Sequence, residues 1–384
     1  MLFGGCNCIA DPASLGALCS GGAGFVSAMM AALAASARTA EATPLGRKVP
    51  EVDRLAVRIV TDNIVIQFIP NEKRGGLTIE RRSGGNTRPD APPRTALNAE
   101  WGLAMHAESV RDGETRHVLV DFGYTPEVLN NNLSILKIDP SLFDAMVLSH
   151  GHYDHFGGMT GFLNSTKGKL KGKLPFYVGG EECFCSREWI GPPMPGNFGA
   201  LDRKALRDAD LEVTFAEGPV LVADHGFASG QIGLTSFEKV LSPTTMKIGV
   251  EDGIGCFPDQ FVAEERAKVV VPDQFRHEIA TSFNLKGRGL VILTSCSHRG
   301  VVNTVKQAQA VSGVQKVHAV IGGFHLAPYG EDYVRQTVIS LKEIDPDYVI
   351  AMHCTGEPFY DIAKAEMPDK LLRAETGTRF VFDA

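Results

Sequence analysis

Residues 145–159 read AMVLSHGHYDHFGGM: an apolar run, then three histidines and an aspartate within six positions, then two glycines. Imidazole nitrogens and a carboxylate form a ligand set that suits zinc and, with more carboxylate or water, iron or manganese. The chain contains only 11 histidines, so chance does not explain their crowding here. The segment therefore predicts a metal site that includes His150, His152, Asp154 and His155.

The same segment is predicted to lie at the carboxyl end of a strand. Residues 143–150, FDAMVLSH, are typical of a short buried strand, and the glycines that follow lead into a helix. Alternate side chains of an extended segment point the same way, so His150 and His152 share one side, while Asp154 and His155 turn back across the helix start. One loop can thus serve two adjacent metals, at the edge where open α/β sheets place their sites.

Hairpins and strand–helix units alternate in two runs along the chain. The first run has a predicted strand at 54–68, a hairpin at 102–124 that turns at Asp112-Gly113, and a helix at 126–139. The second run is predicted to hold strands at 211–226 and 289–300, a helix at 301–313, a strand at 317–326, a helix at 331–344 and a last strand at 347–356. Two such runs predict an α/β fold, a four-layer αβ/βα sandwich with two sheets face to face and helices outside.

The predicted strand ends of the second run carry further metal-capable side chains, namely His298, His325 and His353. Between the runs, residues 183–285 are rich in Gly, Pro and charge, and we expect them to form inserted loops that cover the site.

The N-terminal residues have the composition of a leader. Residues 15–37 are small and apolar with Ala-x-Ala triplets at the end, as in the cleavage region of an export signal, but the first basic residue is Arg38. The protein is thus periplasmic or secreted if this segment is a signal, and cytoplasmic with a flexible leader otherwise. Four glycines and many alanines make the segment weakly apolar, so we expect no stable membrane span. We divide the chain into a leader and linker, 1–54, and one domain, 55–384.

Composition excludes some partners. A hydrophobic content of 44% with 22% charged residues is that of a folded globular protein. The net charge of −7 and the absence of a long Lys/Arg block give no footprint for nucleic acid.

Cys183 and Cys185 match no zinc spacing, so we expect isolated buried or free thiols, with a disulfide as the alternative in an exported protein.

The sequence resembles a known superfamily. SHGHYDHFGG matches the His-x-His-x-Asp-His signature of the metallo-β-lactamase superfamily. In chain order, EWGLAMHAE, VLVDFG, LSHGHYDHFGG, LTSCSHRGVVN, IGGFHL and MHCTGEP resemble the subgroup named after 7,8-dihydropterin-6-yl-methyl-4-(β-D-ribofuranosyl)aminobenzene 5′-phosphate synthase. The resemblance implies a four-layer αβ/βα fold with a mono- or dinuclear metal site between the sheets.

The resemblance also implies roles for single residues. Two divalent metal ions are expected, with zinc favoured and iron or manganese open. The first metal would be bound by His150 and His152 and the second by Asp154 and His155, and His298 and His353 would complete the two sites. Asp121, in VLVDFG, resembles an aspartate that fixes a ligand loop through hydrogen bonds.

The end of the 289–300 strand departs from the superfamily pattern. Many members bridge their metals with an aspartate at the end of a late strand, but residues 295–298 read Ser-Cys-Ser-His and offer no such aspartate for the second metal. Cys296 is either a thiolate ligand or an inert buried thiol, and we favour the thiol. His325 is a ligand, a proton donor or a hydrogen-bond partner of the substrate, and we favour a substrate-side role.

Other polar residues receive substrate or packing roles. Arg299, Asn303 and the start of the helix at 301 are predicted to bind an anionic group of a small-molecule substrate. The remaining histidines are predicted to be surface or packing residues: His106, His117, His225, His277 and His318. Of these, His225 follows a strand in a glycine-containing loop that is able to reach the site.

These residues predict a metal-dependent hydrolase. Metals held by neutral imidazoles activate water near neutral pH, and Asp154 is suited both to bind metal and to hold the proton of that water. A phosphoester or related bond is the expected target. A dihydropterin-type 5′-phosphate synthase, which forms a carbon–nitrogen bond, is the first alternative, and a non-catalytic metal-binding protein is the second.

Overall fold

The computed structural model describes residues 42–82, 90, 95–191 and 195–384. Residues 1–41 of the predicted leader lie outside the described residues. The predicted linker contacts the domain: the Leu45 N–H donates to the Val311 carbonyl (3.1 Å), and β1 (Glu51–Val52) pairs with a strand of a large sheet. Within the described ranges, no helix combines the length and the apolarity needed to cross a membrane.

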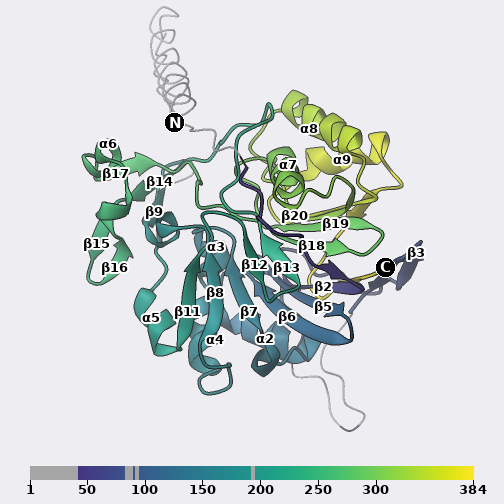
Figure 1. Ribbon diagram of the computed structural model, residues 1–384, viewed down its shortest axis with the longest axis horizontal. Coiled ribbons are helices and arrows are strands. Elements are labelled where there is room, and N and C mark those ends of the chain that lie inside the picture. Colours follow the sequence, from purple (N-terminus) through teal and green to yellow (C-terminus); the bar gives the residue numbers. More distant parts are fainter. Residues whose placement is uncertain (1–41, 83–89, 91–94, 192–194) are drawn as a thin grey trace, which may run out of the picture. The chain divides into compact units, whose positions relative to one another are not determined.

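Two large sheets form the centre of the domain (Figure 1). Sheet I, with nine strands, has the order β11 (Leu211–Phe215), β8 (Leu174–Val178), β7 (Ala145–Leu148), β6 (Glu114–Val120), β5 (Ala104–Arg111), β2 (Arg54–Thr61), β23 (Arg379–Asp383), β4 (Leu77–Glu80) and β3 (Glu72–Arg74). Sheet II, with eight, has the order β12 (Val220–Val222), β13 (Gly226–Ala228), β18 (Thr281–Leu285), β19 (Gly289–Thr294), β20 (Val317–Gly323), β21 (Tyr348–Met352) and β22 (Leu371–Arg373), with β1 beside β18.

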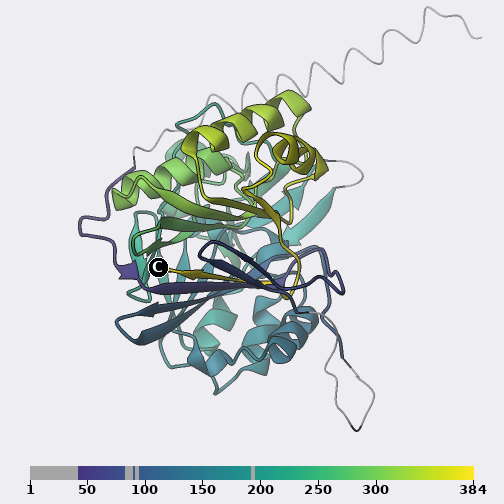
Figure 2. The same cartoon turned by 90° about the vertical axis from the view of Figure 1, so that its right-hand side faces the viewer.

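Helices cover the outer faces of both sheets, which gives four layers (Figure 2). Sheet I is covered by α2 (Pro126–Leu136) and α4 (Met159–Ser165), next to the short helices α3 (Tyr153–Phe156) and α5 (Arg203–Asp208). Sheet II is covered by α7 (Val301–Ser312), α8 (Glu331–Ile344) and α9 (Glu357–Glu366). The four-layer αβ/βα arrangement predicted from the sequence is thus confirmed.

Alternate residues of a strand point to opposite faces of its sheet, and in the central strands both faces are buried. In β7, Val147 points into the core between the sheets, whereas Met146 and Leu148 point to the helices of sheet I. In β19, Leu293 likewise joins the core between the sheets and Ile292 joins the helix side of sheet II. Strands covered on both faces are continuous apolar runs, as AMVL and LVIL are.

A small sheet and a hairpin lie in the stretch predicted to form inserted loops. The sheet has the order β10 (Gly196–Gly199), β9 (Ser186–Trp189), β14 (Thr244–Lys247) and β17 (Val270–Pro272), and the hairpin consists of β15 (Gly249–Glu251) and β16 (Ile254–Cys256), near α6 (Ala263–Arg266). Residues 183–285 also supply β11, β12, β13 and β18 to the large sheets. The stretch is therefore only partly an insertion between the main elements.

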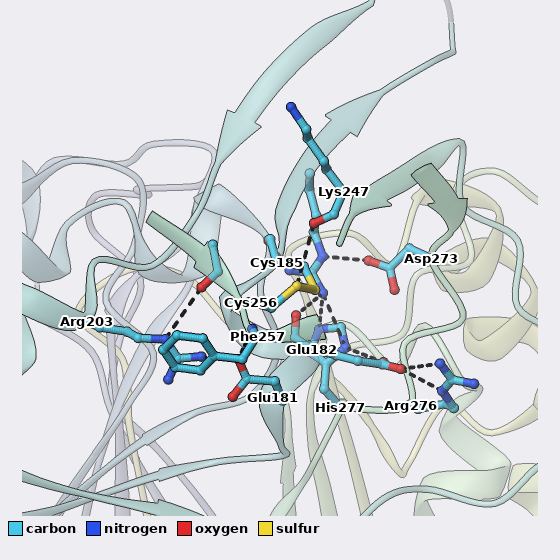
Figure 3. The surroundings of a disulfide bond; sticks show 12 residues. Glu181, Glu182, Cys185, Arg203, Lys247, Cys256, Phe257, Asp273, Arg276 and His277 are labelled. Carbon is cyan, nitrogen blue, oxygen red and sulfur yellow. Dashed lines mark hydrogen bonds and ion pairs between the residues drawn. A yellow bond between two sulfur atoms is a disulfide. The ribbon is translucent and has the colours of Figure 1, made fainter. Parts of the chain in front are cut away.

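A disulfide joins Cys185, next to β9, to Cys256 at the end of the hairpin (Figure 3). The expectation of free thiols is wrong for Cys185, although Cys183 is free and buried. Around the disulfide, the Arg203 guanidinium lies over the Phe257 ring, and Glu182 accepts a hydrogen bond from Arg276 Nε (2.6 Å).

Three element predictions need correction. The strand predicted over 54–68 ends at Thr61, because beyond it the Asp62 N–H donates to Thr376 Oγ1 (2.9 Å) and the chain leaves the sheet. The strand predicted over 211–226 is β11 in sheet I and β12 in sheet II, and Gly226 begins β13. The strand at 347–356 is not the last: α9, β22 and β23 follow it, and β23 returns to sheet I between β2 and β4.

Candidate metal centre

The predicted site residues follow the carboxyl ends of strands in both large sheets. β6 and β7 run parallel in sheet I, and β19, β20 and β21 run parallel in sheet II. Parallel strands end at one edge of a sheet, so the residues that follow them meet there. These residues are Asp121 after β6, His150 after β7, His298 after β19, His325 after β20 and His353 after β21.

The backbone at these strand ends adopts a conformation that side chains rarely take. Asp121 has a φ of 61°, Ser297 of 59°, His325 of 44° and His353 of 56°. Left-handed φ values at residues other than glycine cost about 1–3 kcal/mol each and concentrate at functional sites. The turns place the side chains that follow the strands on the common edge of the two sheets.

His150, His152 and His298 form the first group of predicted ligands. Their donor atoms lie within 4.8 Å of one another, and Nε2 of His150 is 3.2 Å from Nε2 of His298. The Ser149 hydroxyl donates to Asp121 Oδ2 (2.8 Å), so its oxygen accepts from His150 Nδ1 (2.9 Å) and His150 Nε2 keeps its lone pair. Nε2 of His152 is buried without a hydrogen-bond partner in the described structure, which fits a metal ligand.

Asp154, His155 and His353 form the second group, with donor atoms again within 4.8 Å of one another. Oδ2 of Asp154 lies 3.2 Å from His353 Nε2 and 3.5 Å from His155 Nε2. Nδ1 of His155 donates to Asp121 Oδ2 (2.8 Å), which leaves Nε2 to face the group. The structure therefore brings together all six predicted ligands, and it places His298 beside His150 and His152, and His353 beside Asp154 and His155.

Asp121 connects the two groups. It is fully buried, its Oδ1 accepts the Ser149 N–H (2.8 Å), and its Oδ2 accepts from both the Ser149 hydroxyl and His155. One carboxylate thus orients His150 through Ser149 and His155 directly. These contacts are of the kind that the resemblance implies for it.

The protonation states differ between the groups. Burial lowers the pKa of His150 and His298 well below the usual range and that of His152 to about 3, so all three are neutral near pH 7. Burial also opposes charge on His155, but the carboxylates of Asp154 and Asp121 outweigh it and raise the pKa of His155 to about 10. Without metal, His155 is therefore protonated near pH 7, and a metal would have to displace this proton.

A cavity of about 430 Å³ opens onto both groups. Its walls include His152, Asp154, His298 and His353, the thiols Cys296 and Cys354, and the aromatic side chains Trp101, Tyr124, Tyr153, Trp189 and Phe198. Trp189 and Phe198 belong to the small sheet, which thus contributes a wall. None of the described residues that line the cavity is Lys or Arg.

His325 lies at this cavity, as a substrate-side residue would. It is half-buried, and its ring centroid is 4.0 Å from that of His298. One of its ring nitrogens is also within 4.8 Å of the donor atoms of Cys296 and His298. The position suits a proton donor to the cavity as well as a ligand.

Arg299 and Asn303 do not line the cavity, and their predicted substrate role does not fit their placement. Both are buried. Arg299 Nη1 donates to the Gln274 carbonyl (2.7 Å), and Asn303 Oδ1 accepts the Thr235 and Ser236 N–H groups (2.8 and 2.7 Å). Their polar atoms hold neighbouring loops in place, so neither is available to a substrate in the cavity.

Two buried residues support the ligand loops: Glu278, which the sequence reasoning did not single out, and His277, to which it gave a surface or packing role. Glu278 accepts the His298 N–H (2.7 Å) and the Arg299 N–H (2.8 Å). His277 Nε2 accepts the Gly151 N–H (3.0 Å), next to the first two ligands. No sequence signal marks either, because their partners lie 20 or more positions away.

The other histidines predicted to have packing roles contact residues outside the metal centre. His106 Nε2 lies 3.1 Å from His117 Nδ1, and His318 Nδ1 lies 2.6 Å from Asp347 Oδ2. His225 Nδ1 lies 3.0 Å from Ser109 Oγ and does not line the cavity.

Comparisons with known proteins show what the chain is similar to. A family model described as the metallo-beta-lactamase superfamily matches residues 110–172. A 7,8-dihydropterin-6-methyl-4-(beta-D-ribofuranosyl)-aminobenzene-5′-phosphate synthase of Methanocaldococcus jannaschii is 26% identical over 285 residues, which cover 73% of this chain and 89% of the relative. An uncharacterized protein of the same organism is 26% identical over 241 residues, which cover 63% and 80%. A crystal structure of a metal-dependent hydrolase of the beta-lactamase superfamily aligns with a TM-score of 0.58 at 21% identity, covering 85% of this chain and 98% of that one, and so shows the same fold.

Proposed function

We propose that this chain, which carries a metallo-β-lactamase domain and has the fold of that superfamily, is a metal-dependent hydrolase. The resemblance predicted from the sequence, to the superfamily and to its synthase-named subgroup, is confirmed by the family model and the relative. One observation carries the proposal: two adjacent groups of three metal-capable side chains open onto one cavity. An open position beside the ligands is what distinguishes a catalytic from a structural metal site.

The two groups of side chains would hold two divalent metals, and we propose zinc. Bound metals would lower the pKa of a bound water to a value near neutral and would polarise the bond under attack. We assign Asp154, which lines the cavity, to orient that water and accept its proton. His325, on the sheet II side of the cavity, is assigned to donate a proton to the leaving group. The aromatic walls exclude bulk water and strengthen both interactions.

The cavity also narrows the substrate class. Its aromatic walls favour a substrate with a planar or apolar body, which would stack on Trp101 or Phe198. Because no described Lys or Arg lines the cavity, a single anionic group would bind through the metals. We therefore propose a phosphoester, or a related bond, that joins a small anionic group to an aromatic or apolar body.

A synthase of the dihydropterin type is the second candidate. The relative of that name covers most of this chain, and an aromatic cavity accepts a planar ring. The two candidates differ in their reaction: the hydrolase would break an ester bond, whereas the synthase would form a carbon–nitrogen bond. The third reading, a metal-binding protein without catalysis, is disfavoured because the predicted ligands line an open cavity.

Metal content and chelator-sensitive hydrolysis test the proposal together. Protein purified without added metal should contain about two metals per chain, as elemental analysis would show, and should hydrolyse an aryl phosphomonoester, an aryl phosphodiester or an aryl lactone. Activity should vanish on chelation and return with zinc. His152→Ala should abolish it, whereas the matched variant His225→Ala, outside the cavity, should retain it. Two bound metals without hydrolysis of any ester would favour the synthase.

We also propose that the protein is exported. The leader composition and the Cys185–Cys256 disulfide support an oxidising compartment, because disulfides persist there and are rare in a reducing cytosol. Mass spectrometry of the mature protein tests this proposal: cleavage after an Ala-x-Ala triplet before Arg38 is expected, and an intact N-terminus would contradict it.

A further inference from the structure

We infer that Cys296 supplies a thiolate ligand shared by the two metals. The inference rests on the metal centre proposed above and assigns that centre a ligand beyond the six predicted from the sequence. It replaces the expectation that Cys296 is an inert thiol.

The position of the Cys296 sulfur carries the inference. Cys296 follows β19, is buried, and lines the cavity. Its Sγ is 3.2 Å from Nε2 of His155, the nitrogen that faces the second group. Two donors of one zinc ion, at about 2.0–2.1 Å for nitrogen and about 2.3 Å for sulfur, are separated by roughly 3–4 Å. The sulfur and the imidazole are therefore spaced as two ligands of one metal.

The same sulfur reaches both groups. Its donor atom lies within 4.8 Å of those of His150 and His155, and it forms a second such set with His298 and His325. A third set contains His353 and Cys354. Since His150 and His298 belong to the first group and His155 and His353 to the second, the sulfur lies between the two predicted metal positions.

Coordination numbers agree with a shared donor. Each group provides three protein ligands, whereas zinc prefers four and expands to five during catalysis. A thiolate between the metals gives each a fourth donor and leaves one position for water or substrate. A soft sulfur ligand also favours zinc or cobalt over magnesium and manganese.

Cys354 provides the matched comparison for Cys296. Its sulfur lies 3.4 Å from Cys296 Sγ, and its S–H donates toward that atom. Cys354 is also buried and lines the same cavity. We therefore assign Cys354 to hold a hydrogen bond to the shared sulfur, not to bind the metals itself. In Cys354→Ser, the hydroxyl would keep this donor to Cys296.

Cobalt(II) is the probe, because a thiolate ligand gives it a sulfur-to-metal charge-transfer band that nitrogen and oxygen ligands do not give. The metal-free full-length protein is loaded with cobalt, and both the absorption and the cobalt content are measured. We expect the band in the wild type, in Cys354→Ser and in Cys183→Ser, a variant of a buried thiol that does not line the cavity. Cys296→Ser should lose the band, and Cys296→Asp should bind two cobalt ions without it.

The outcomes separate this inference from the proposed function. Two bound cobalt ions without a band in the wild type, or a band that only Cys354→Ser removes, would overturn the role of Cys296 and leave the hydrolase proposal standing. A wild type that binds no cobalt would overturn both. If Cys296→Ser does not fold, X-ray absorption of the zinc-loaded wild type decides: a sulfur neighbour at about 2.3 Å is expected, and a shell of nitrogen and oxygen alone would contradict the inference.

Discussion

A single side chain, that of Asp121, orients ligands of both groups. It holds Ser149 and His155 at the same time, and so connects ligands of both groups. In Asp121→Asn, the amide NH2 would face the His155 N–H and the Ser149 hydroxyl, and donors would oppose donors. We expect affinity for the second metal to fall about 10- to 100-fold, measured by competition with a chelator. The exposed variant Asp361→Asn is the control, and an equal loss there would refute the assignment.

The different protonation states of the two groups predict different pH dependences. The pKa of His155 is raised to about 10, so below that pH a metal must displace its proton. Affinity for the second metal should therefore rise with pH, by about tenfold per unit between about pH 6.5 and 8.5. The first group is already neutral in this window, because burial lowers the pKa of His152 to about 3. In Cys296→Asp, where no thiol has to lose a proton, the affinity of the first group should therefore stay flat. Chelator competition with this variant at several pH values measures both affinities, and equal slopes would contradict the prediction.

The sequence predicts single residues well where a motif marks them. The six predicted ligands and Asp121 all reach the centre, because they follow strands whose carboxyl ends meet at one edge. The substrate role predicted for Arg299 and Asn303 does not fit the structure, because the sequence of a strand–helix turn does not show in which direction its side chains point. Their atoms bond to residues 232–236 and 274, far away in sequence. Glu278 and the reach of the Cys296 sulfur depend on such long-range neighbours as well.

Secondary structure elements were predictable where their pattern is local. The helix expected over 331–344 is α8 with the same bounds, and the hairpin turning at Asp112-Gly113 is β5 and β6. The strands after β21 were missed because β22 has only three residues and β23 is defined by pairing with β2 across most of the chain, Leu55 opposite Phe382. Non-local pairing of this kind leaves no periodic signal.

At the same scale, the disulfide should stabilise the small sheet against the hairpin. It closes a loop with a sequence separation of 71 residues, and such cross-links typically contribute about 2–4 kcal/mol by restricting the unfolded chain. Cys185→Ser with Cys256→Ser should therefore lower the melting temperature. A reductant should lower that of the wild type as well but leave the double variant unchanged. A wild type insensitive to reductant, despite complete reduction shown by thiol titration, would contradict the prediction.

For the whole molecule, the metal centre joins two halves of the fold. Four predicted ligands follow β7 in sheet I, whereas His298 and His353 follow strands of sheet II. The core between the sheets joins them as well, through residues such as Val147 and Ile321. A metal bound by ligands of both sheets is therefore a cross-link in the folded state that the unfolded chain lacks.

This cross-link predicts that metal stabilises the entire domain. A ligand that binds only the folded state adds about 2.7 kcal/mol when its free concentration is about 100 times its Kd. Calorimetry should show one unfolding transition whose temperature rises with zinc and falls with chelator. His298→Ala removes a sheet II ligand and should lose most of this dependence, whereas His318→Ala, which alters a histidine bonded to Asp347, should keep it. If chelation destabilised only one of two separate transitions, the metals would hold one half of the fold and not both, because a cross-link between the sheets has to act on both at once.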